Sequence, residues 1–467
     1  MLFLFSEKKF KMTTEIIEKY NIPVPRYTSY PPANFFTESF NQADYIQAVD
    51  DSNTNQPQHI SIYIHIPFCK HLCHYCGCNS YPMMKQEVVD NYLLALKQEL
   101  KFILNRLYKS RKVSQIHYGG GSPSALPAAR LKELNDFILA RFNTIENPEI
   151  AIECHPGYIT REQWIEIAEA GFNRISIGIQ DLHQDVLDAV HRKSSIVPLT
   201  EIFTILRERN IAINLDFIYG LPLQTPERFE ENMKQVLALQ PDRVVTFSYA
   251  HVPWVNPNMK KLEEIGLPEQ ETKKTIFETI SNILTQGGYE PIGIDHFVKA
   301  DDELYLAYKD KKLHRNFQGY CTKRTTGQVY AFGVSAISQL ADAYAQNTKS
   351  IEEYIEHMQS DFDIVRKGYK LSIDQQIVRD AIMMLMCNEC LIWSDLAQTF
   401  NLSIDDIRCK LFYAEAILNE MAADGLITLT DEGIHATEEG RIFTRNIAAA
   451  FDPLWKDNGE QRYSKPI

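Results

Sequence analysis

Residues 59–80 read HISIYIHIPFCKHLCHYCGCNS, and they decide how the rest of the chain is interpreted. The first eight residues alternate in the manner of a β-strand. Directly after them, four of the nine cysteines of the chain fall within ten residues, at Cys69, Cys73, Cys76 and Cys78. A strand that ends in a group of thiols predicts a metal or redox site at its carboxyl end.

Five further strands follow the same pattern, and each strand of the six is followed by a helix or a helix-sized segment. Alternation of β and α elements predicts a parallel sheet with helices outside. Six units are fewer than the eight of a full TIM barrel, so we expect an α/β fold with a (β/α)6 partial barrel. The strands are expected at residues 59–66, 114–118, 149–153, 174–180, 213–220 and 243–250.

The carboxyl ends of these strands carry polar residues and glycines. Parallel α/β folds build their sites at that edge, because the loops that follow the strands converge there. The sequence therefore predicts one site that gathers side chains from several strands. Besides the cysteines, the strand-end residues are Gly119–Gly121, Glu153, Gln180 with Asp181, Asp216 with Tyr219, and Tyr249 with His251.

The length of 467 residues is too great for one ordinary domain. Residues 22–32, with four prolines, predict an extended arm within residues 1–55, and residues 13–58 look irregular apart from a helical start after Met12. Residues 1–11 are expected to be an extension outside the fold. The barrel is expected over residues 56–355, and a mostly helical, winged-helix-like domain with a small hairpin over residues 356–467.

The charge balance is acidic, with 48 Lys and Arg against 61 Asp and Glu and a net charge of −13. This excludes affinity of the whole chain for nucleic acid, and an anionic substrate would need a locally basic pocket. The apolar run MLFLF at residues 1–5 is too short for a signal peptide or a membrane span. We therefore expect a cytoplasmic protein, where clustered thiols more often bind metals or act in redox chemistry than form disulfides.

The cysteine spacing C-x3-C-x2-C leaves three interpretations open. Structural zinc usually takes two pairs of ligands that are separated by a longer gap. A disulfide or a chance cluster is a second interpretation. In the third, Cys69, Cys73 and Cys76 hold three irons of a 4Fe–4S cluster and leave the fourth iron open for a ligand. Cys78 is too close to Cys76 to bind the same cube easily, and it is not assigned as a ligand.

The spacing CKHLCHYC at residues 69–76 resembles the signature of the radical S-adenosylmethionine (SAM) enzymes. Further stretches extend the likeness from about residue 20 to the C-terminus, and the chain as a whole resembles the oxygen-independent coproporphyrinogen III oxidases. These stretches are PRYTSYP (25–31), YIHIPFCKHLCHYCGC (63–78), HYGGGSP (117–123), GFNRISIGIQD (171–181), DFIYGLPLQTP (216–226), YAHVP (249–253), DHF (295–297), LHRNFQGY (313–320) and GVSAIS (333–338).

This resemblance implies anaerobic oxidative decarboxylation of two propionates of coproporphyrinogen III to vinyls, which gives protoporphyrinogen IX in haem biosynthesis. One 4Fe–4S cluster per chain would donate an electron to SAM, and the resulting 5′-deoxyadenosyl radical would take a hydrogen from each propionate. Two SAM molecules per chain are implied, one for each vinyl group. An electron donor such as flavodoxin or ferredoxin is implied as well, and no segment indicates a symmetric interface, so we expect a monomer.

The resemblance also assigns roles to single residues. Cys69, Cys73 and Cys76 would hold the cluster. The SAM on the cluster would be held by Tyr63, Gly120, Glu153 and Ile337. The second SAM would be met by Tyr75, Gly121, Ser122, Gln180, Arg192, Asp216 and Ala250. From the residues alone, Arg192 in VHRKSS is better interpreted as a solvated surface charge.

Substrate contacts and competing functions complete the expectations. The propionates need cations, and the candidates are Arg26, His314 with Arg315, and Arg111 with Lys112. A radical SAM enzyme that methylates and opens haem is one alternative function, and a haem chaperone without turnover is another. The arm motif RYTSYP and the extra cysteine in CGC count against the chaperone. A zinc-binding regulatory module that uses the C-terminal domain is a more distant alternative.

Overall fold

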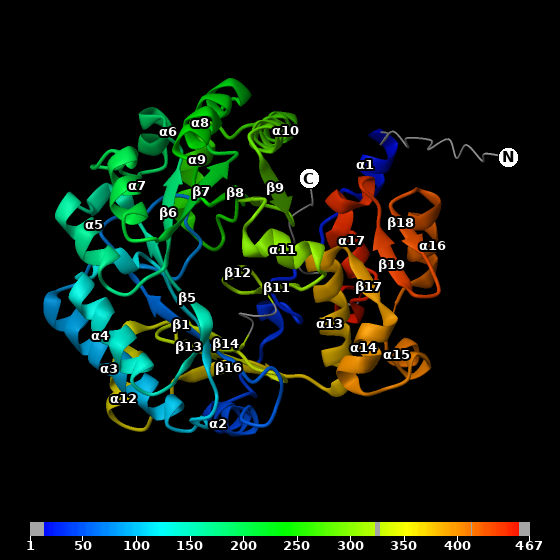
Figure 1. Ribbon diagram of the computed structural model, residues 1–467, viewed down its shortest axis with the longest axis horizontal. Coiled ribbons are helices and arrows are strands. Elements are labelled where there is room, and N and C mark those ends of the chain that lie inside the picture. The colour runs from blue at the N-terminus through cyan, green and yellow to red at the C-terminus, as the bar shows by residue number, and fades with distance from the viewer. Residues whose placement is uncertain (1–13, 323–326, 412, 457–467) are drawn as a thin grey trace. The chain divides into compact units, whose positions relative to one another are not determined.

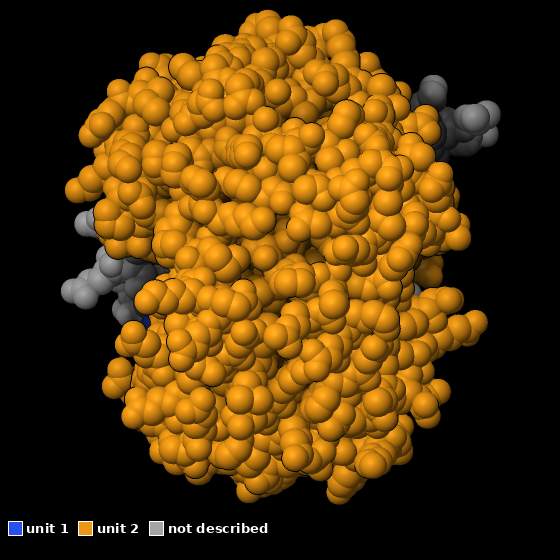
Figure 2. Space-filling model, turned by 90° about the vertical axis from the view of Figure 1, so that its left-hand side faces the viewer, with its two compact units in different colours: residues 1–35, 311–320, 371–467 blue, residues 36–310, 321–370 orange. Residues whose placement is uncertain are grey.

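The computed structural model describes residues 14–322, 327–411 and 413–456, which form parts of two compact units. Unit 1 takes residues 1–35, 311–320 and 371–467, and unit 2 takes residues 36–310 and 321–370 (Figure 2). The expected extension at residues 1–11 lies outside the described part of the chain. The division of the chain at residues 55 and 355 stays a prediction.

Unit 2 is built on a 12-stranded sheet, with helices along its outer side (Figure 1). Seven neighbouring strands are parallel, and six of them are the six predicted strands. The partial barrel is therefore confirmed. In sheet order the parallel strands are β13 (Gln328–Phe332), β1 (Ile60–Ile66), β4 (Val113–Gly120), β5 (Thr144–Cys154), β6 (Arg174–Gln180), β7 (Ala212–Tyr219) and β8 (Arg243–Ser248).

The helices that follow these strands bury one apolar face against the sheet. In α7, for example, Ile202, Phe203, Ile205 and Leu206 are buried, at the i, i+3 and i+4 spacing of an amphipathic helix. Strand β1 is buried almost along its whole length, as expected for a parallel strand covered on both faces. These helices are α3 (Gln86–Leu104), α4 (Ala128–Leu139), α5 (Arg161–Ala168), α6 (Gln184–Ala189), α7 (Leu199–Arg207) and α8 (Pro226–Leu239).

Antiparallel strands extend the parallel sheet at both ends. Beyond β13 lie β14 (Ile337–Gln339), β15 (Ala343–Asn347) and β16 (Val365–Lys370). Beyond β8 lie β10 (His296–Lys299) and β9 (Tyr289–Ile292). The other helices of this unit are α2 (Gln42–Asp51), α9 (Lys260–Ile265), α10 (Gln270–Gln286), α11 (Glu303–Lys309) and α12 (Ile351–Gln359).

Helix α2 corrects the expectation that residues 13–58 are irregular. Its sequence is polar and lacks a clear apolar period, but Asn41 and Asp44 form a capping box that fixes its first turn. Tyr45, Ala48 and Val49 are the residues that it buries. The predicted arm therefore contributes one capped helix to unit 2.

Unit 1 combines helices with a three-stranded antiparallel sheet, which confirms a mostly helical C-terminal region. The expected small hairpin is β18 (Ile427–Leu429) with β19 (Gly433–Ala436), and β17 (Cys390–Ile392) pairs with β19. The helices are α1 (Thr14–Tyr20), α13 (Ile373–Asn388), α14 (Trp393–Phe400), α15 (Ile404–Lys410), α16 (Glu415–Ala423), α17 (Thr444–Ala449) and α18 (Pro453–Lys456). Strands β11 (Leu313–Asn316) and β12 (Gly319–Thr322) form a separate two-stranded ladder.

The proline-rich segment is packed into unit 1. Val24, Tyr27 and Tyr30 are fully or almost fully buried, and the Tyr27 hydroxyl donates to an Asp452 carboxylate oxygen over 2.9 Å. The Arg445 guanidinium donates to the backbone carbonyls of Val24 and Pro25. These contacts hold an extended segment without a strand or helix of its own.

Candidate functional site

The cysteines lie in a closed loop at the carboxyl end of β1. Two short strands, β2 (Phe68–Cys69) and β3 (Tyr81–Pro82), pair in parallel at the base of the loop. The Tyr81 and Met83 amides donate to the Pro67 and Cys69 carbonyls, each over 2.8 Å. The loop that holds the thiols is therefore tied at both ends to the buried strand.

The thiols of this loop influence one another. The Cys78 thiol hydrogen-bonds to Cys76 and lowers the pKa of Cys76 to about 6. Burial, assisted by Cys76 and Cys73, raises the pKa of Cys69 to about 12. Cys76 is thus the thiol that most readily becomes a thiolate, whereas iron would have to displace a proton from Cys69.

No three His, Cys, Asp or Glu side chains within residues 14–322, 327–411 and 413–456 are arranged around one metal position. The thiols of Cys69, Cys73 and Cys76 are free, so each of them can bind a different iron of a cube. Two buried polar atoms, Oε1 of Gln180 at the end of β6 and Oδ1 of Asn214 within β7, have no hydrogen-bond partner. The residues present therefore fit a cluster in the loop with a polar ligand beside it.

Three consecutive glycines pack closely against β1 and the cysteine loop. A Cβ atom at Gly119 would lie 2.8 Å from Glu153 Oε1, and one at Gly121 would lie 2.6 Å from the Pro67 carbonyl oxygen and 3.0 Å from Cys69 Sγ. Gly120 has a φ of 111°, and its Cβ would lie 2.6 Å from the His65 ring. Side chains are therefore excluded here by the neighbouring strand and loop.

Glu153 ends β5 with its side chain 43% exposed, so it is open to a ligand. Its Oε1 lies 3.0 Å from Nε2 of His117, a residue of β4 that the sequence analysis missed. Burial opposes the charged form of His117, but the contact with Glu153 outweighs burial and raises the pKa of His117. The ring of Tyr63 stacks on that of His117, with 6.0 Å between centroids, so Tyr63, His117 and Glu153 form one group.

Arg192 is buried, so its interpretation as a solvated surface charge is wrong. Its guanidinium donates to the Tyr75 hydroxyl over 3.0 Å, to Cys73 Sγ over 3.5 Å and to the Gly178 carbonyl of β6. Burial opposes its charge, but Tyr75 and Cys73 outweigh burial and raise its pKa. Arg192 therefore ties the cysteine loop to the end of β6, where Gln180 also lies.

Asp216 lies on β7 beside Gly178 of β6. Its carboxylate accepts from the Ser176 hydroxyl over 2.5 Å and from Asn214 Nδ2 over 2.7 Å. Burial raises the pKa of Asp216 to about 6 despite these hydrogen bonds. A buried carboxylate with a raised pKa gains from a cationic ligand, so this position suits an ammonium group.

The remaining predicted residues lie at three other points. The Ser122 amide donates to the Phe68 carbonyl over 3.1 Å, which places Ser122 beside the cysteine loop. Ala250 follows the end of β8, and Ile337 begins β14, two strands away from β1. Side-chain contacts and strand pairing thus connect the predicted residues to one another, except for Ala250 and Ile337, whose place at the site rests on strand order.

The turn before Ile337 is held by Glu99, a buried residue of α3 that the sequence analysis missed. Glu99 accepts hydrogen bonds from the Gly333 amide over 2.8 Å, from Asn347 Nδ2 over 2.8 Å and from the Tyr354 hydroxyl over 2.5 Å. Burial raises its pKa to about 7. In the sequence it looks like any polar residue of an amphipathic helix.

One candidate substrate cation is excluded by the structure. Arg111 is buried before the first residue of β4, at the end of the strand opposite to the glycines. Its guanidinium donates to the Gln58 carbonyl over 2.9 Å and to the Tyr330 hydroxyl over 2.7 Å. Arg111 therefore fixes neighbouring segments and does not reach the carboxyl-end site.

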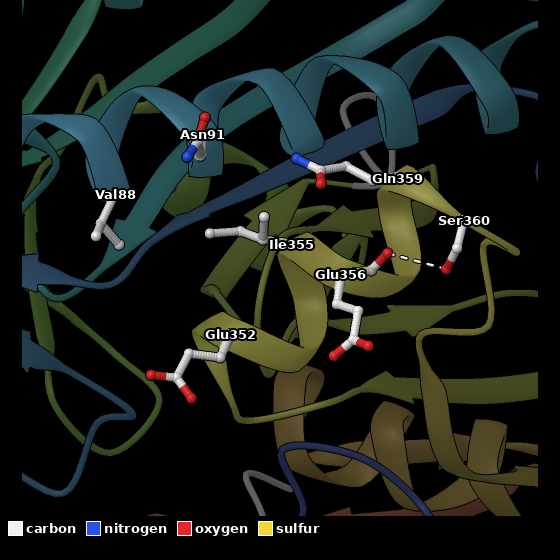
Figure 3. A pocket seen from close by; sticks show the side chains of 7 residues that line it. All are labelled: Val88, Asn91, Glu352, Ile355, Glu356, Gln359 and Ser360. Carbon is white, nitrogen blue, oxygen red and sulfur yellow. Dashed lines mark hydrogen bonds between the residues drawn. The ribbon is translucent and has the colours of Figure 1, made fainter.

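A groove of 520 Å³ lies between α3 and α12, away from all of these residues (Figure 3). Val88 and Asn91 line it from α3, and Glu352, Ile355 and Glu356 from α12. The groove is open and lies on the outer helices. It contains none of the strand-end residues, so it is not the predicted site.

Comparison with known proteins finds relatives that agree with one another in name and cover nearly the whole chain. Residues 63–236 match the family model described as radical SAM superfamily, and residues 371–443 match the HemN C-terminal domain. Curated proteins named oxygen-independent coproporphyrinogen III oxidase are 38% identical in Synechocystis sp. (98% of both chains) and 38% identical in Escherichia coli (97% of this chain, 98% of the relative). A solved structure of coproporphyrinogen III oxidase (HemN) from Escherichia coli, described as a radical SAM enzyme, aligns with a TM-score of 0.84 and 37% identity, covering 92% of this chain and 97% of that one.

Proposed function

The chain belongs to the oxygen-independent coproporphyrinogen III oxidase family of the radical SAM superfamily, and on that premise we propose how its residues serve the reaction. It is an oxidoreductase that oxidises coproporphyrinogen III without oxygen in haem biosynthesis. The haem-methylating and chaperone alternatives are not favoured. The finer reaction that we propose is decarboxylation of two propionates to vinyls, which yields protoporphyrinogen IX.

The family uses a 4Fe–4S cluster and SAM, and we assign the cluster to Cys69, Cys73 and Cys76. When bound, the cluster supplies the electron for the reductive cleavage of SAM. Cys78 donates to Cys76 and thereby favours its thiolate form. Arg192 places a buried positive charge against Cys73 and so offsets part of the negative charge that thiolates bring into the loop.

The first SAM would be held at the cluster by Tyr63, Gly120, Glu153 and Ile337. The half-exposed Glu153 carboxylate can accept from the ammonium group of its methionine part. His117 orients this carboxylate through the 3.0 Å contact. Glu99 acts indirectly, because it fixes the turn that leads to Ile337.

A second SAM would bind to Tyr75, Gly121, Ser122, Gln180, Arg192, Asp216 and Ala250. Two opposite charges among these residues suit a zwitterion: Arg192 for a carboxylate and Asp216 for an ammonium. The unpartnered Gln180 Oε1 is a further acceptor in the same place. Two SAM molecules per chain correspond to the two propionates that must react.

The partners and location that we propose follow the same reaction. A one-electron donor such as flavodoxin or ferredoxin would reduce the cluster, and the enzyme would act as a cytoplasmic monomer. No helix in the described ranges is both long and apolar enough to cross a membrane. Arg26 and His314 with Arg315 stay candidates for the substrate carboxylates, whereas Lys112, like Arg111, precedes β4 at the end opposite to the glycines.

The single observation that carries this proposal is the near-complete coverage of a coproporphyrinogen III oxidase at 38% identity. The test is an anaerobic assay of the iron-reconstituted protein with SAM, a reductant, cell extract and coproporphyrinogen III. We expect about two deoxyadenosines and two CO2 for each protoporphyrinogen, as the two-propionate stoichiometry requires. SAM cleavage with unchanged porphyrinogen would overturn the substrate and leave the radical SAM chemistry standing.

A further inference from the structure

A patch of lysines and histidines covers the outside of the cysteine loop. All of its members lie in unit 2, and all except His74 are exposed. We call it the basic patch, and it is not used by any step assigned above. It consists of Lys70, His71, His74, His191, Lys193 and Lys261.

Ring and cation–π contacts join these side chains into one surface. His71 stacks on Tyr158 with 5.6 Å between ring centroids, and the ammonium groups of Lys70 and Lys193 lie 5.7 and 5.2 Å from the centroid of the same Tyr158 ring. His191 lies 5.2 Å from His71, measured between ring centroids. The residues therefore form a cluster of aromatic rings with two ammonium groups against Tyr158, in which the His71 and His191 rings meet edge to face.

The patch continues along the loop to α9. His74 stacks on His191 with 5.0 Å between ring centroids, and Lys261 Nζ lies 3.5 Å from His74 Nε2. The acidic residues of α6 are Asp185, which binds Arg228, and Asp188, which binds Gln184. Those of α9 are Glu263, which binds His251, and Glu264. The stacked rings themselves belong only to histidine and tyrosine side chains, and the side chains beside them are lysines.

The patch lies directly over the cluster thiols. Lys70, His71 and His74 belong to the cysteine loop itself, and the His74 amide donates to the Val190 carbonyl over 3.0 Å. His191 Nδ1 lies 2.9 Å from the Leu72 carbonyl oxygen, and the next residue, Arg192, reaches Cys73. Only one layer of residues therefore separates the patch from the thiols.

The charge of this patch is opposite to that of the chain. The chain carries a net charge of −13, so an acidic protein is repelled by most of its surface. Long-range attraction steers an acidic partner toward positive surface, and the lysines of this patch, Lys70, Lys193 and Lys261, supply positive charge beside the cysteine loop. Electron transfer also weakens steeply with distance, and a carrier must therefore dock close to the cluster that it reduces.

We propose that the basic patch is the docking site of an acidic one-electron carrier protein that reduces the cluster. This inference rests on the proposed function and deepens it by locating the partner. Each docking event would oxidise the carrier by one electron and reduce the cluster by one electron, one event for each SAM cleaved. Aromatic residues at the centre with charges around them are a common composition of protein interfaces.

The test compares the reconstituted wild-type protein with the double variant Lys193→Glu, Lys261→Glu. A bacterial flavodoxin serves as the probe, and its affinity is measured by isothermal titration calorimetry at several salt concentrations. We expect the double variant to bind about tenfold or more weakly at low salt and to lose most of the salt dependence, since rim charges act through screened attraction. Lys101→Glu, Lys109→Glu, on two exposed lysines outside the patch, makes the same change of charge and should bind as the wild type does.

A second measurement separates docking from chemistry. The rate of cluster reduction, followed by its visible absorbance, is recorded with reduced flavodoxin and with dithionite-reduced methyl viologen. The double variant should be slowed with flavodoxin only, because the small viologen needs no docking surface. Neither readout depends on turnover of the porphyrinogen, so both stand even where the proposed substrate is wrong.

Three outcomes would overturn the inference. The first is equal flavodoxin binding by the wild type and the double variant. The second is an equal loss of reduction rate with both reductants, which would place the lysines in the structure of the loop. The third is a raised KM for coproporphyrinogen with unchanged flavodoxin binding, which would make the patch a substrate surface.

Discussion

Substitution of Glu99 by glutamine tests whether a buried carboxyl group makes unit 2 less stable as pH rises. Burial raises the pKa of Glu99 from 4.5 to about 7. When the pKa of a group is higher in the folded state than in the unfolded state, the contribution of the group to the free energy of unfolding is complete below the pKa of the unfolded state. This contribution is lost as the pH rises through the pKa of the folded state. The wild-type protein should therefore become less stable between pH 4.5 and 7, because Glu99 ionises in the unfolded chain over this range while burial keeps it protonated in the folded protein.

The magnitude follows from the size of the pKa shift. The difference between 4.5 and about 7 corresponds to a total of about 3 kcal/mol. About 2 kcal/mol of this falls between pH 5.5 and pH 8. Glutamine does not titrate, so Glu99→Gln should lack this loss, although its amide cannot accept all three hydrogen bonds that the carboxylate accepts from Gly333, Asn347 and Tyr354.

The assay is urea unfolding of the cluster-free protein, anaerobic and reduced, from pH 5.5 to 8. The free energy of unfolding of the wild type minus that of Glu99→Gln should fall by about 2 kcal/mol over this range. Glu356→Gln, on an exposed residue of α12, controls for the loss of one negative charge. Parallel curves for the wild type and Glu99→Gln would refute the reasoning, because they would mean that Glu99 has the same pKa in both states.

Three further predictions concern the site itself. Gly121→Ala would place a Cβ 2.6 Å from the Pro67 carbonyl oxygen. We therefore expect this variant to bind less than half as much iron as the wild type in an iron and sulfide assay, and full iron occupancy would contradict this. Arg192→Lys should retain its iron but form deoxyadenosine at least about tenfold more slowly, because a lysine cannot reach Tyr75 and the Gly178 carbonyl together. SAM binding by the wild type, measured by equilibrium dialysis, should weaken as the pH falls below about 6, where Asp216 takes up a proton. The variant Asp216→Asn should bind SAM more weakly and without that pH dependence. Equal pH dependence in both proteins would remove Asp216 from the site.

Much of the fold of unit 2 could be predicted from the sequence, because local patterns report it. The six strands alternate or form short apolar runs, and each is followed by a helix-sized segment. Strand β13 was not predicted, since QVYAF lacks an alternating pattern and its pairing with β1 is formed over a long distance in sequence. Helix α2 was missed because its apolar residues are few, although Asn41 and Asp44 were a usable start signal.

The site was predictable where topology alone brings residues together. Glu153 and Gln180 lie at the carboxyl ends of β5 and β6, and Asp216 lies on the neighbouring β7, so their proximity follows from the fold class. Arg192 is different, because its polar neighbours in sequence suggest a surface loop and only its contacts with Tyr75 and Cys73 bury it. Such contacts between distant segments leave no local pattern in the sequence.

The packing of the proline-rich segment into unit 1 has a consequence for how the protein is made. The Tyr27 hydroxyl and Asp452, which hydrogen-bond, are separated by 425 positions. A ribosome synthesises the segment around Tyr27 first, and its partner leaves the ribosome only after all of unit 2 has been made. The barrel can therefore fold while this early segment is still waiting, and unit 1 closes last. A nascent chain stalled after residue 370 should expose the segment to protease although the barrel is already protected.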